Sequence, residues 1–166
     1  TIRNGDGPHL LFNGHTDTVS IAGMTINPTG GEIRDDRLWG RGATDMKGPL
    51  AAMLATLLRL REQDDWSGAL TVGCVVDEEY KYRGILSLLD ANDPWDFAVV
   101  GEPTALKVVR GCKGSCRFTI HTEGRAAHSS EPRNGANAIV GMAKAIPAMA
   151  EFFETRLGEY TAEGFE

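Results

Sequence analysis

A run of apolar and small residues, 69–76, leads directly into the acids Asp77, Glu78 and Glu79. Because the run is nearly all apolar and rich in β-branched residues, it predicts a central strand that is covered on both faces. Adjacent carboxylates at the end of a buried strand repel one another unless cations or protons offset their charge. The acids also fit a solvated helix N-terminus, where negative charge is favourable. This stretch alone therefore leaves a metal site and a helix start as equal alternatives.

Other apolar runs end in the same manner. Residues 9–13 predict a buried strand, and His15 and Asp17 follow it closely. Residues 96–101 predict another buried strand, with Glu102 at its C-terminal end. In open α/β sheets the carboxyl ends of parallel strands face one edge, and this edge is where ligands bind. We therefore expect these side chains to converge on one site.

Asp45 lies between a glycine-rich turn, Gly40 to Gly42, and an apolar helical pattern that extends from about residue 50 to 63. Its backbone is fixed on both sides, which suits either a metal-bridging acid or an ordinary helix N-cap. Taken alone, this stretch favours the cap. The expected convergence of His15 and the other acids reverses that preference, and we predict that Asp45 belongs to the same site.

Further elements are predicted from periodicity and turn residues. They are a hairpin from 32–34 and 37–39, a short helix over 84–89, a half-buried strand over 117–122 and a helix over 136–157. Pro147 predicts a kink or break inside the last helix. His9 and His121 lie in predicted strands, and we expect neither to take part in a site.

Alternating strands and helices predict an α/β fold over residues 1–112, with a mostly parallel sheet flanked by helices. Gly111, Gly114 and Ser115 predict a hinge at the end of this part. The strand, loop and helix predicted within residues 113–166 cannot bury a core alone, so we interpret them as the start of a smaller α+β domain. Both domains are expected to be incomplete.

The charge balance and the cysteines limit the classes of partner and compartment. The formal net charge is −6 without any basic block, so neither nucleic acid nor an anionic membrane is an expected partner. No apolar run approaches the ~20 residues that cross a bilayer. The sequence has three cysteines, Cys74, Cys112 and Cys116, an odd number that does not suggest a disulfide framework. This favours a reducing compartment and predicts a cytoplasmic protein.

The residue types in the expected site indicate hydrolytic chemistry. Histidine nitrogens and carboxylate oxygens are ordinary ligands of Zn²⁺, and the absence of cysteine from the set favours a catalytic over a structural zinc. A carboxylate that bridges two ions is the layout of aminopeptidase-type sites. Of two adjacent glutamates, one can bind metal while the other acts as the base for a water. The set therefore predicts cleavage of an amide bond.

The motifs around these residues occur in an order that resembles one known family. They are Gly14-His15-Thr16-Asp17-Thr18, Gly40-Arg41-Gly42-Ala43-Thr44-Asp45-Met46-Lys47-Gly48, Asp77-Glu78-Glu79, Gly101-Glu102-Pro103-Thr104 and Ala127-His128-Ser129-Ser130. The chain resembles the acetylornithine deacetylase, succinyl-diaminopimelate desuccinylase and aminoacylase family of metallohydrolases. The resemblance covers nearly the whole chain, and the motifs are highly specific when taken together.

The resemblance implies a site for two zinc ions, with Co²⁺ or Mn²⁺ as alternatives. His15, Asp45 and Glu102 would bind one ion, and Asp45 would bridge to a second ion held by Glu79. Glu78 would be the general base and acid. Residues 1–112 would then be a zinc-peptidase-like catalytic domain, and residues 113–166 the start of a lid or dimerisation domain.

The resemblance also assigns supporting roles. Asp17 would lie behind His15 and orient it. His128, in the smaller domain, would reach the active site of a partner in a homodimer and steady the oxyanion. Members of the family also tend to hold the peptide bond after the bridging acid in cis, here Asp45–Met46.

One departure from the family pattern concerns the second metal. Its remaining ligand is a histidine near the C-terminus of the family's chains, and no histidine lies beyond His128 here. We therefore expect this chain to be an internal portion of a longer enzyme, with the first metal site complete and the second short of one ligand. The isolated portion is expected to be weakly active or inactive.

The predicted function is zinc-dependent hydrolysis of a small N-acyl amino acid or related substrate, of the deacetylase or desuccinylase type. A dipeptidase or carboxypeptidase of the same family is the alternative within this class. A truncated binding or dimerisation module without turnover is the alternative from another class. Nucleotide binding through Gly40 and Gly42 is disfavoured, because this turn does not directly follow a buried strand and lacks the third glycine of the usual motif.

Overall fold

The computed structural model describes residues 1–91 and 93–160. It divides into two compact units, Thr1–Val108 and Val109–Glu166. The predicted change of function at residue 112, from a catalytic domain to a lid or dimerisation domain, stays a prediction.

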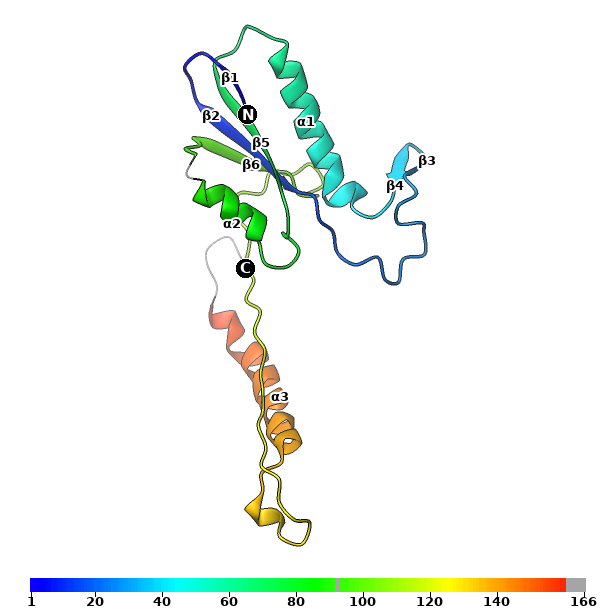
Figure 1. Cartoon of the computed structure of the whole chain (residues 1–166), viewed down its shortest axis with the longest axis vertical. Helices are drawn as coiled ribbons and strands as arrows, with labels where there is room; N and C mark the ends of the chain where they lie inside the picture. Colours follow the sequence, from blue (N-terminus) through cyan, green and yellow to red (C-terminus); the bar gives the residue numbers. More distant parts are fainter. Residues whose placement is uncertain (92, 161–166) are drawn as a thin grey trace. The chain divides into compact units, whose positions relative to one another are not determined.

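The first unit is built on a four-stranded sheet in the order β1-β5-β2-β6 (Figure 1). The strands are β1 (Ile2–Asn4), β2 (His9–His15), β5 (Gly68–Val75) and β6 (Phe97–Val100). β2 pairs in parallel with both β5 and β6, whereas β1 is antiparallel to β5. The predicted mostly parallel sheet is therefore confirmed, and the carboxyl ends of its parallel strands share one edge.

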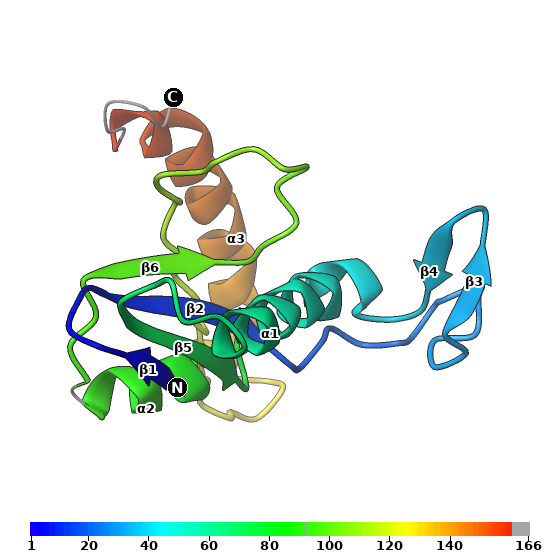
Figure 2. The same cartoon turned by 90° about the horizontal axis from the view of Figure 1, so that it is seen from above.

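Two helices cover opposite faces of this sheet, as Figures 1 and 2 show. α1 (Gly48–Arg61) and α2 (Arg83–Asp90) follow the predicted helices within a few residues. A side chain placed at Gly14 of β2 would meet Leu50 of α1, whereas one at Gly73 of β5 would meet Leu88 of α2. Gly73 pairs with Asn13, the residue before Gly14. Because adjacent residues of a strand face opposite sides of the sheet, Gly14 and Gly73 face opposite sides. The two helices thus lie on opposite faces of the sheet. The prediction of a buried strand over 96–101 is wrong, because β6 at the edge of the sheet is exposed along its whole length.

The core of the first unit lies under the N-terminal half of α1. Met46, Leu50 and Met53 form the buried cluster, with Phe12 and Val72 packed against it. The apolar pattern over 50–63 predicted that the whole helix packs on the sheet. Later apolar positions instead point to solvent, for example Leu54 and Leu58, which are 44% and 50% exposed.

The predicted hairpin is confirmed as β3 (Glu32–Arg34) and β4 (Arg37–Trp39), with Ile33 opposite Leu38. Its turn residues, Asp35 and Asp36, both have positive φ, which is the backbone that tight hairpin turns require. The strand predicted over 9–13 was expected to end at Gly14. β2 instead continues through His15, because pairing with β5 persists to the His15–Val75 register.

The second unit contains one long helix, α3 (Ala138–Thr155), between short 3₁₀ turns at Pro132–Asn134 and Leu157–Glu159. The Asn137 side chain caps α3 by accepting hydrogen bonds from the N–H groups of Ile139 and Val140. A kink or break was predicted at Pro147, and the break does not occur, because α3 continues through this residue. Alanines on both sides of Pro147 favour helix.

The strand predicted over 117–122 is also wrong for the part of the chain that is described. This stretch forms no ladder, and the neighbouring pairing is a single bridge between Arg125 and Ala136. Alternating polarity makes a strand only where another strand offers its backbone groups. No such partner lies among residues 109–160.

Cys74, Cys112 and Cys116 are all free and exposed. Cys74 lies in β5, whereas Cys112 and Cys116 lie outside the helices and strands. Across residues 1–91 and 93–160, none of the helices combines the length and apolar character needed to cross a membrane. The cytoplasmic location stays a prediction.

Candidate metal centre

The carboxyl ends of β2, β5 and β6 deliver the predicted residues to one edge of the sheet. β2 ends at His15, which is in register with Val75 at the end of β5. Glu78 and Glu79 follow β5, and Glu102 follows β6. The predicted convergence on a single edge is confirmed, because His15 lies within ligand distance of Glu78 and Glu79 in one group and of Glu102 in another.

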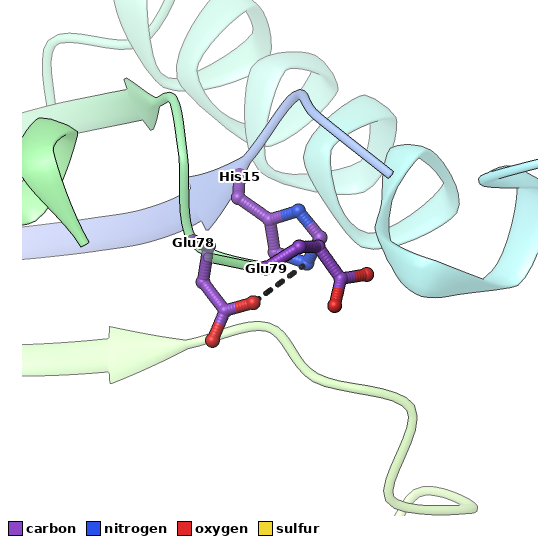
Figure 3. A group of neighbouring side chains, drawn as sticks. All are labelled: His15, Glu78 and Glu79. Carbon is purple, nitrogen blue, oxygen red and sulfur yellow. Dashed lines mark ion pairs between the residues drawn. The ribbon is translucent and has the colours of Figure 1, made fainter. Parts of the chain in front are cut away.

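His15 belongs to two groups of side chains that could hold a metal ion. In the first, ligand atoms of His15, Glu78 and Glu79 lie within 4.8 Å of one another (Figure 3). In the second, His15, Asp45 and Glu102 meet the same limit. Imidazole nitrogen with carboxylate oxygens is an ordinary donor set for Zn²⁺, and neither group contains a thiolate. The donor chemistry therefore fits a catalytic zinc site.

The ring of His15 is buried and held from both sides. Nδ1 lies 2.9 Å from the backbone carbonyl oxygen of Asp17, and Nε2 lies 3.0 Å from Oδ1 of Asp45. Oε2 of Glu78 is 3.8 Å from the same Nε2. A neutral ring that donates from Nδ1 leaves the lone pair of Nε2 facing the acids, where a metal ion would be bound.

The pKa of His15 is set by opposing influences. Burial lowers this pKa, but the hydrogen bonds to Asp17 and Asp45 and the charges of Glu102 and Glu78 together raise it above the usual 6.5. A proton on Nε2 thus occupies the position among the carboxylates that a cation would take. Proton and metal ion compete for this nitrogen.

Two of the acids hold their protons more tightly than usual. Burial raises the pKa of Glu78 and of Glu102, the charge of His15 opposes this rise, and neighbouring carboxylates add to it. The ionised forms of these two carboxyl groups are therefore destabilised when no cation is present. Such a cluster of mutually destabilised acids is typical of functional sites.

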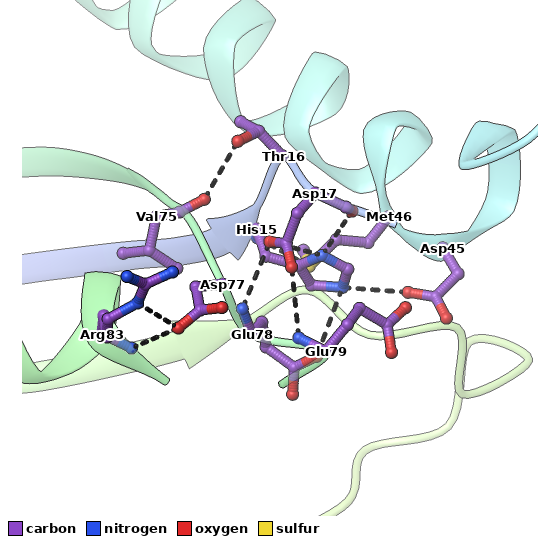
Figure 4. A network of polar contacts seen from close by, with 10 residues as sticks. All are labelled: His15, Thr16, Asp17, Asp45, Met46, Val75, Asp77, Glu78, Glu79 and Arg83. Atoms are coloured by element: carbon purple, nitrogen blue, oxygen red, sulfur yellow. Dashed lines mark hydrogen bonds and ion pairs between the residues drawn. The ribbon is translucent and has the colours of Figure 1, made fainter. Parts of the chain in front are cut away.

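Asp17 contacts His15 in a way that differs from the expectation. The predicted orienting contact comes from the Asp17 backbone carbonyl, whereas its carboxylate Oδ1 lies 3.6 Å from Nδ1 of His15. The carboxylate instead accepts hydrogen bonds from the backbone N–H groups of Glu78 and Glu79, each at 3.2 Å (Figure 4). Burial raises the pKa of Asp17, but these hydrogen bonds outweigh it and the pKa lies below its usual value.

Asp45 is not the N-cap of α1, which resolves the alternative left open by its sequence. The helix begins at Gly48, and Lys47 occupies the cap position. Asp45 and Met46 have non-helical backbone angles within the turn Ala43–Lys47. The peptide bond between them is cis, as the resemblance implied.

Met46, which sequence reasoning missed, fixes the segment that carries Asp45. Its side chain is fully buried, and its sulfur accepts a hydrogen bond from the backbone N–H of His15 at 3.1 Å. Gly14 and Gly101 make room for it, since a Cβ at either position would collide with neighbouring side chains that include Met46. The glycines at two strand ends were the available signal.

The other histidines lie outside these groups. The ring of His9 is buried, and its nitrogens lie 3.0 Å from the carbonyl of Pro94 and 2.8 Å from the hydroxyl of Thr71, which indicates a structural residue. His128 is exposed in the second unit, where its Nδ1 lies 2.8 Å from Oγ of Ser130. Its predicted role in a partner's active site stays a prediction.

Comparison with known proteins places the chain among hydrolases. A model of peptidase family M20/M25/M40 matches residues 11–159. Proteins named succinyl-diaminopimelate desuccinylase are similar along most of the chain. One from Bradyrhizobium sp. is 33% identical over 88% of this chain, one from Methylorubrum populi 35% over 96%, and one from Rhizorhabdus wittichii 37% over 90%.

The relatives are considerably longer than this chain. The matched regions cover 42% of the Bradyrhizobium protein, 46% of the Methylorubrum protein and 42% of the Rhizorhabdus protein. The chain thus spans less than half of the length of the curated relatives it matches.

Proposed function

The chain belongs to peptidase family M20/M25/M40, and from this premise we propose that the protein is a zinc-dependent hydrolase of an amide bond in a small N-acyl amino acid. The observation that carries the proposal is the membership of His15 in two groups of carboxylates at one sheet edge. The names of the relatives favour an N-succinyl substrate that bears a free carboxylate.

The first metal-binding role follows one of the two groups: His15, Asp45 and Glu102 would hold one zinc ion. The second role follows the family resemblance, by which Asp45 would also reach a second ion held by Glu79. When bound, the ions would polarise the scissile carbonyl and lower the pKa of a bound water. Nδ1 of His15 is engaged by the Asp17 carbonyl, which keeps Nε2 directed at the acids.

Glu78 is proposed as the general base. Its Oε2 would take a proton from the attacking water and return it to the leaving nitrogen. The raised pKa of Glu78 and its partial burial support a role in proton transfer. Because Glu78 also lies within ligand distance of His15, its role as base or ligand requires an experiment.

The second unit is proposed as the start of a lid or dimerisation domain, so that the full-length protein is a homodimer. His128 would then act on the oxyanion in the partner's site. Because the chain spans less than half of the length of the relatives it matches, a further ligand of the second ion would come from a part of the protein outside these residues. We therefore expect little turnover from the 166-residue chain by itself.

A dipeptidase or carboxypeptidase is the second candidate, because the matching family is described as a peptidase family. The chemistry at Glu78 and at the metal ions would be the same for both candidates. Only the substrate differs, since an N-succinyl amino acid carries a second carboxylate that an ordinary dipeptide lacks.

The test is hydrolysis by the zinc-loaded full-length protein, with an N-succinyl amino acid and a dipeptide as substrates. We expect preference for the N-succinyl compound. Glu78→Gln should lower kcat at least about 100-fold, within the contribution of a general base, while zinc content stays at the wild-type level. Asp65→Asn, at an exposed acid outside the site, is the matched control and should leave both unchanged.

Preference for the dipeptide would replace the first candidate by the second. Loss of zinc together with activity in Glu78→Gln would make Glu78 a ligand instead of the base. Zinc binding without hydrolysis of either substrate by the wild-type protein would favour the binding module without turnover.

A further inference from the structure

The loop between β5 and α2, residues 76–82, carries both glutamates of the candidate site. Asp77, the first acid of this loop, belongs to neither group around His15. Its carboxylate lies against Arg83, whereas Glu78 and Glu79 lie toward His15 (Figure 4). The mechanism proposed above makes no use of Asp77 or Arg83.

Asp77 closes the loop on itself. Oδ2 accepts hydrogen bonds from Nε of Arg83 at 2.7 Å and from the backbone N–H of Arg83 at 3.4 Å. Its backbone carbonyl accepts from the N–H groups of Lys81 at 3.2 Å and Tyr82 at 2.6 Å. One residue therefore ties the start of the loop to the first turn of α2.

The backbone conformation and the burial of Asp77 fit its role in tying the loop to α2. Its φ of 65° is in the left-handed region, which aspartate tolerates better than most residues. Its side chain is only 12% exposed, although that of Arg83 is 74% exposed. Hydrogen bonds between ionised partners are stronger than neutral ones. The 2.7 Å hydrogen bond from Nε of Arg83 to Oδ2 of Asp77 is of this kind.

Asp17 supports the same loop from the opposite side. Its carboxylate accepts hydrogen bonds from the N–H groups of Glu78 and Glu79, so the segment that follows β2 holds their backbone directly. The Asp77–Arg83 pair fixes the residue immediately before them from α2. The backbone of the glutamates is thus held between two carboxylates, neither of which belongs to the groups around His15.

We propose that Asp77 and Arg83 are positioning residues, whose ion pair orients the loop so that Glu78 and Glu79 face His15. The inference rests on the proposed function for its kinetic consequences. Breaking the ion pair removes none of the ligand residues, but it releases one end of the loop that orients them. Outer groups that orient metal ligands change affinity or activity 10–100-fold when they are removed. Since this pair acts through the backbone, we expect the lower end, about 10-fold.

The test compares Asp77→Asn, Arg83→Gln and the double variant in the full-length protein. Each single variant should bind zinc about 10-fold more weakly and lose about 10-fold in kcat with KM little changed. The double variant should lose no more than the worse single variant, because the two residues act as one unit. Arg83→Lys keeps a cation near Asp77 and should recover part of the loss.

Arg34→Gln is the matched control, since Arg34 also pairs with an acid, Glu32, but in the β3–β4 hairpin. It should leave zinc affinity and kcat unchanged. Unchanged zinc affinity and kcat in Arg83→Gln would overturn the inference, and so would a double variant whose losses equal the product of the single losses. Losses of zinc affinity and kcat that merely parallel a fall in melting temperature, with no recovery in Arg83→Lys, would mean that the ion pair only stabilises the fold. This result would also overturn the inference.

Amide hydrogen exchange separates this inference from the proposed function. Arg83→Gln should speed exchange at the N–H groups of residues 78–82 and leave those of α1 unchanged. A wild-type protein without zinc binding or turnover would refute the proposed function, and the exchange result would still decide the inference. Equal loop exchange in the variant and the wild type would overturn the inference whatever the activity.

Discussion

The sheet edge and the loop of the second unit hold a histidine in contrasting ways. His15 is buried, and its ring is held in part by Asp45, which is thirty residues away in the sequence. His128 is exposed, and Nδ1 of its ring lies 2.8 Å from Oγ of Ser130, two residues away. The first histidine is positioned by the fold of its unit, the second by its own loop. A site that works within one unit therefore centres on His15.

The largest effect is expected from His15→Ala. Because both groups contain His15, the variant should lose zinc affinity by at least about 100-fold, above the 10–100-fold cost of an outer orienting residue. Glu102→Ala removes a ligand from one group only and should cost less. Isothermal titration with Zn²⁺ measures both. Equal losses in the two variants would contradict the central position of His15.

Stability should also differ between the two units. Met46→Ala empties a fully buried position beside the site and should lower the free energy of unfolding by about 2–5 kcal/mol. Met149→Ala, at a half-buried position of α3, is the control and should cost clearly less. Urea denaturation of the metal-free protein measures the difference. Similar losses would show that Met46 does not anchor the segment of Asp45.

The pH dependence sharpens the contrast further. The folded-state pKa of His15 is raised above 6.5, so the charged ring stabilises the metal-free fold fully below about pH 6.5, and this contribution is lost as pH rises through the raised pKa. The stability difference between wild type and His15→Gln should therefore shrink with rising pH. Zinc affinity should change in the opposite direction and increase, because zinc and the proton compete. A pH-independent stability difference would contradict this account.

His128→Ala should have the smallest effect on the metal centre. Its side chain belongs to neither metal-binding group, so zinc affinity should stay within about 2-fold of wild type, well below the cost of an orienting residue. If His128 acts in a partner's site, kcat of the full-length dimer should fall nonetheless. A loss of zinc affinity comparable to that of Glu102→Ala would place His128 among the ligands.

Much of the sheet edge could be predicted because its signals are local. An apolar run that ends in acids identifies a strand and its functional end, as at Glu78 and Glu102. Parallel pairing then brings such ends together without further information. The hairpin with Asp35 and Asp36 in its turn is equally local. These features were predicted from residues adjacent in the sequence.

The remaining features depend on residues far apart in the chain. The sequence near Asp17 does not reveal that its carboxylate accepts hydrogen bonds from the backbone N–H groups of Glu78 and Glu79, which lie 61 and 62 residues later. The packing of Met46 over Gly14 and Gly101 likewise requires the register of two strands. The error over 117–122 has the same origin, since alternating polarity does not show whether a partner strand is present.

The most direct test of the metal centre is a zinc titration of the wild-type protein, Asp45→Asn and Asp65→Asn. Asp45 lies 3.0 Å from Nε2 of His15, whereas Asp65 is an exposed acid outside both groups. Tight zinc binding by the wild type and Asp65→Asn, lost in a folded Asp45→Asn, is the predicted result. The same zinc affinity in all three proteins would contradict the assignment of the sheet edge as the metal site.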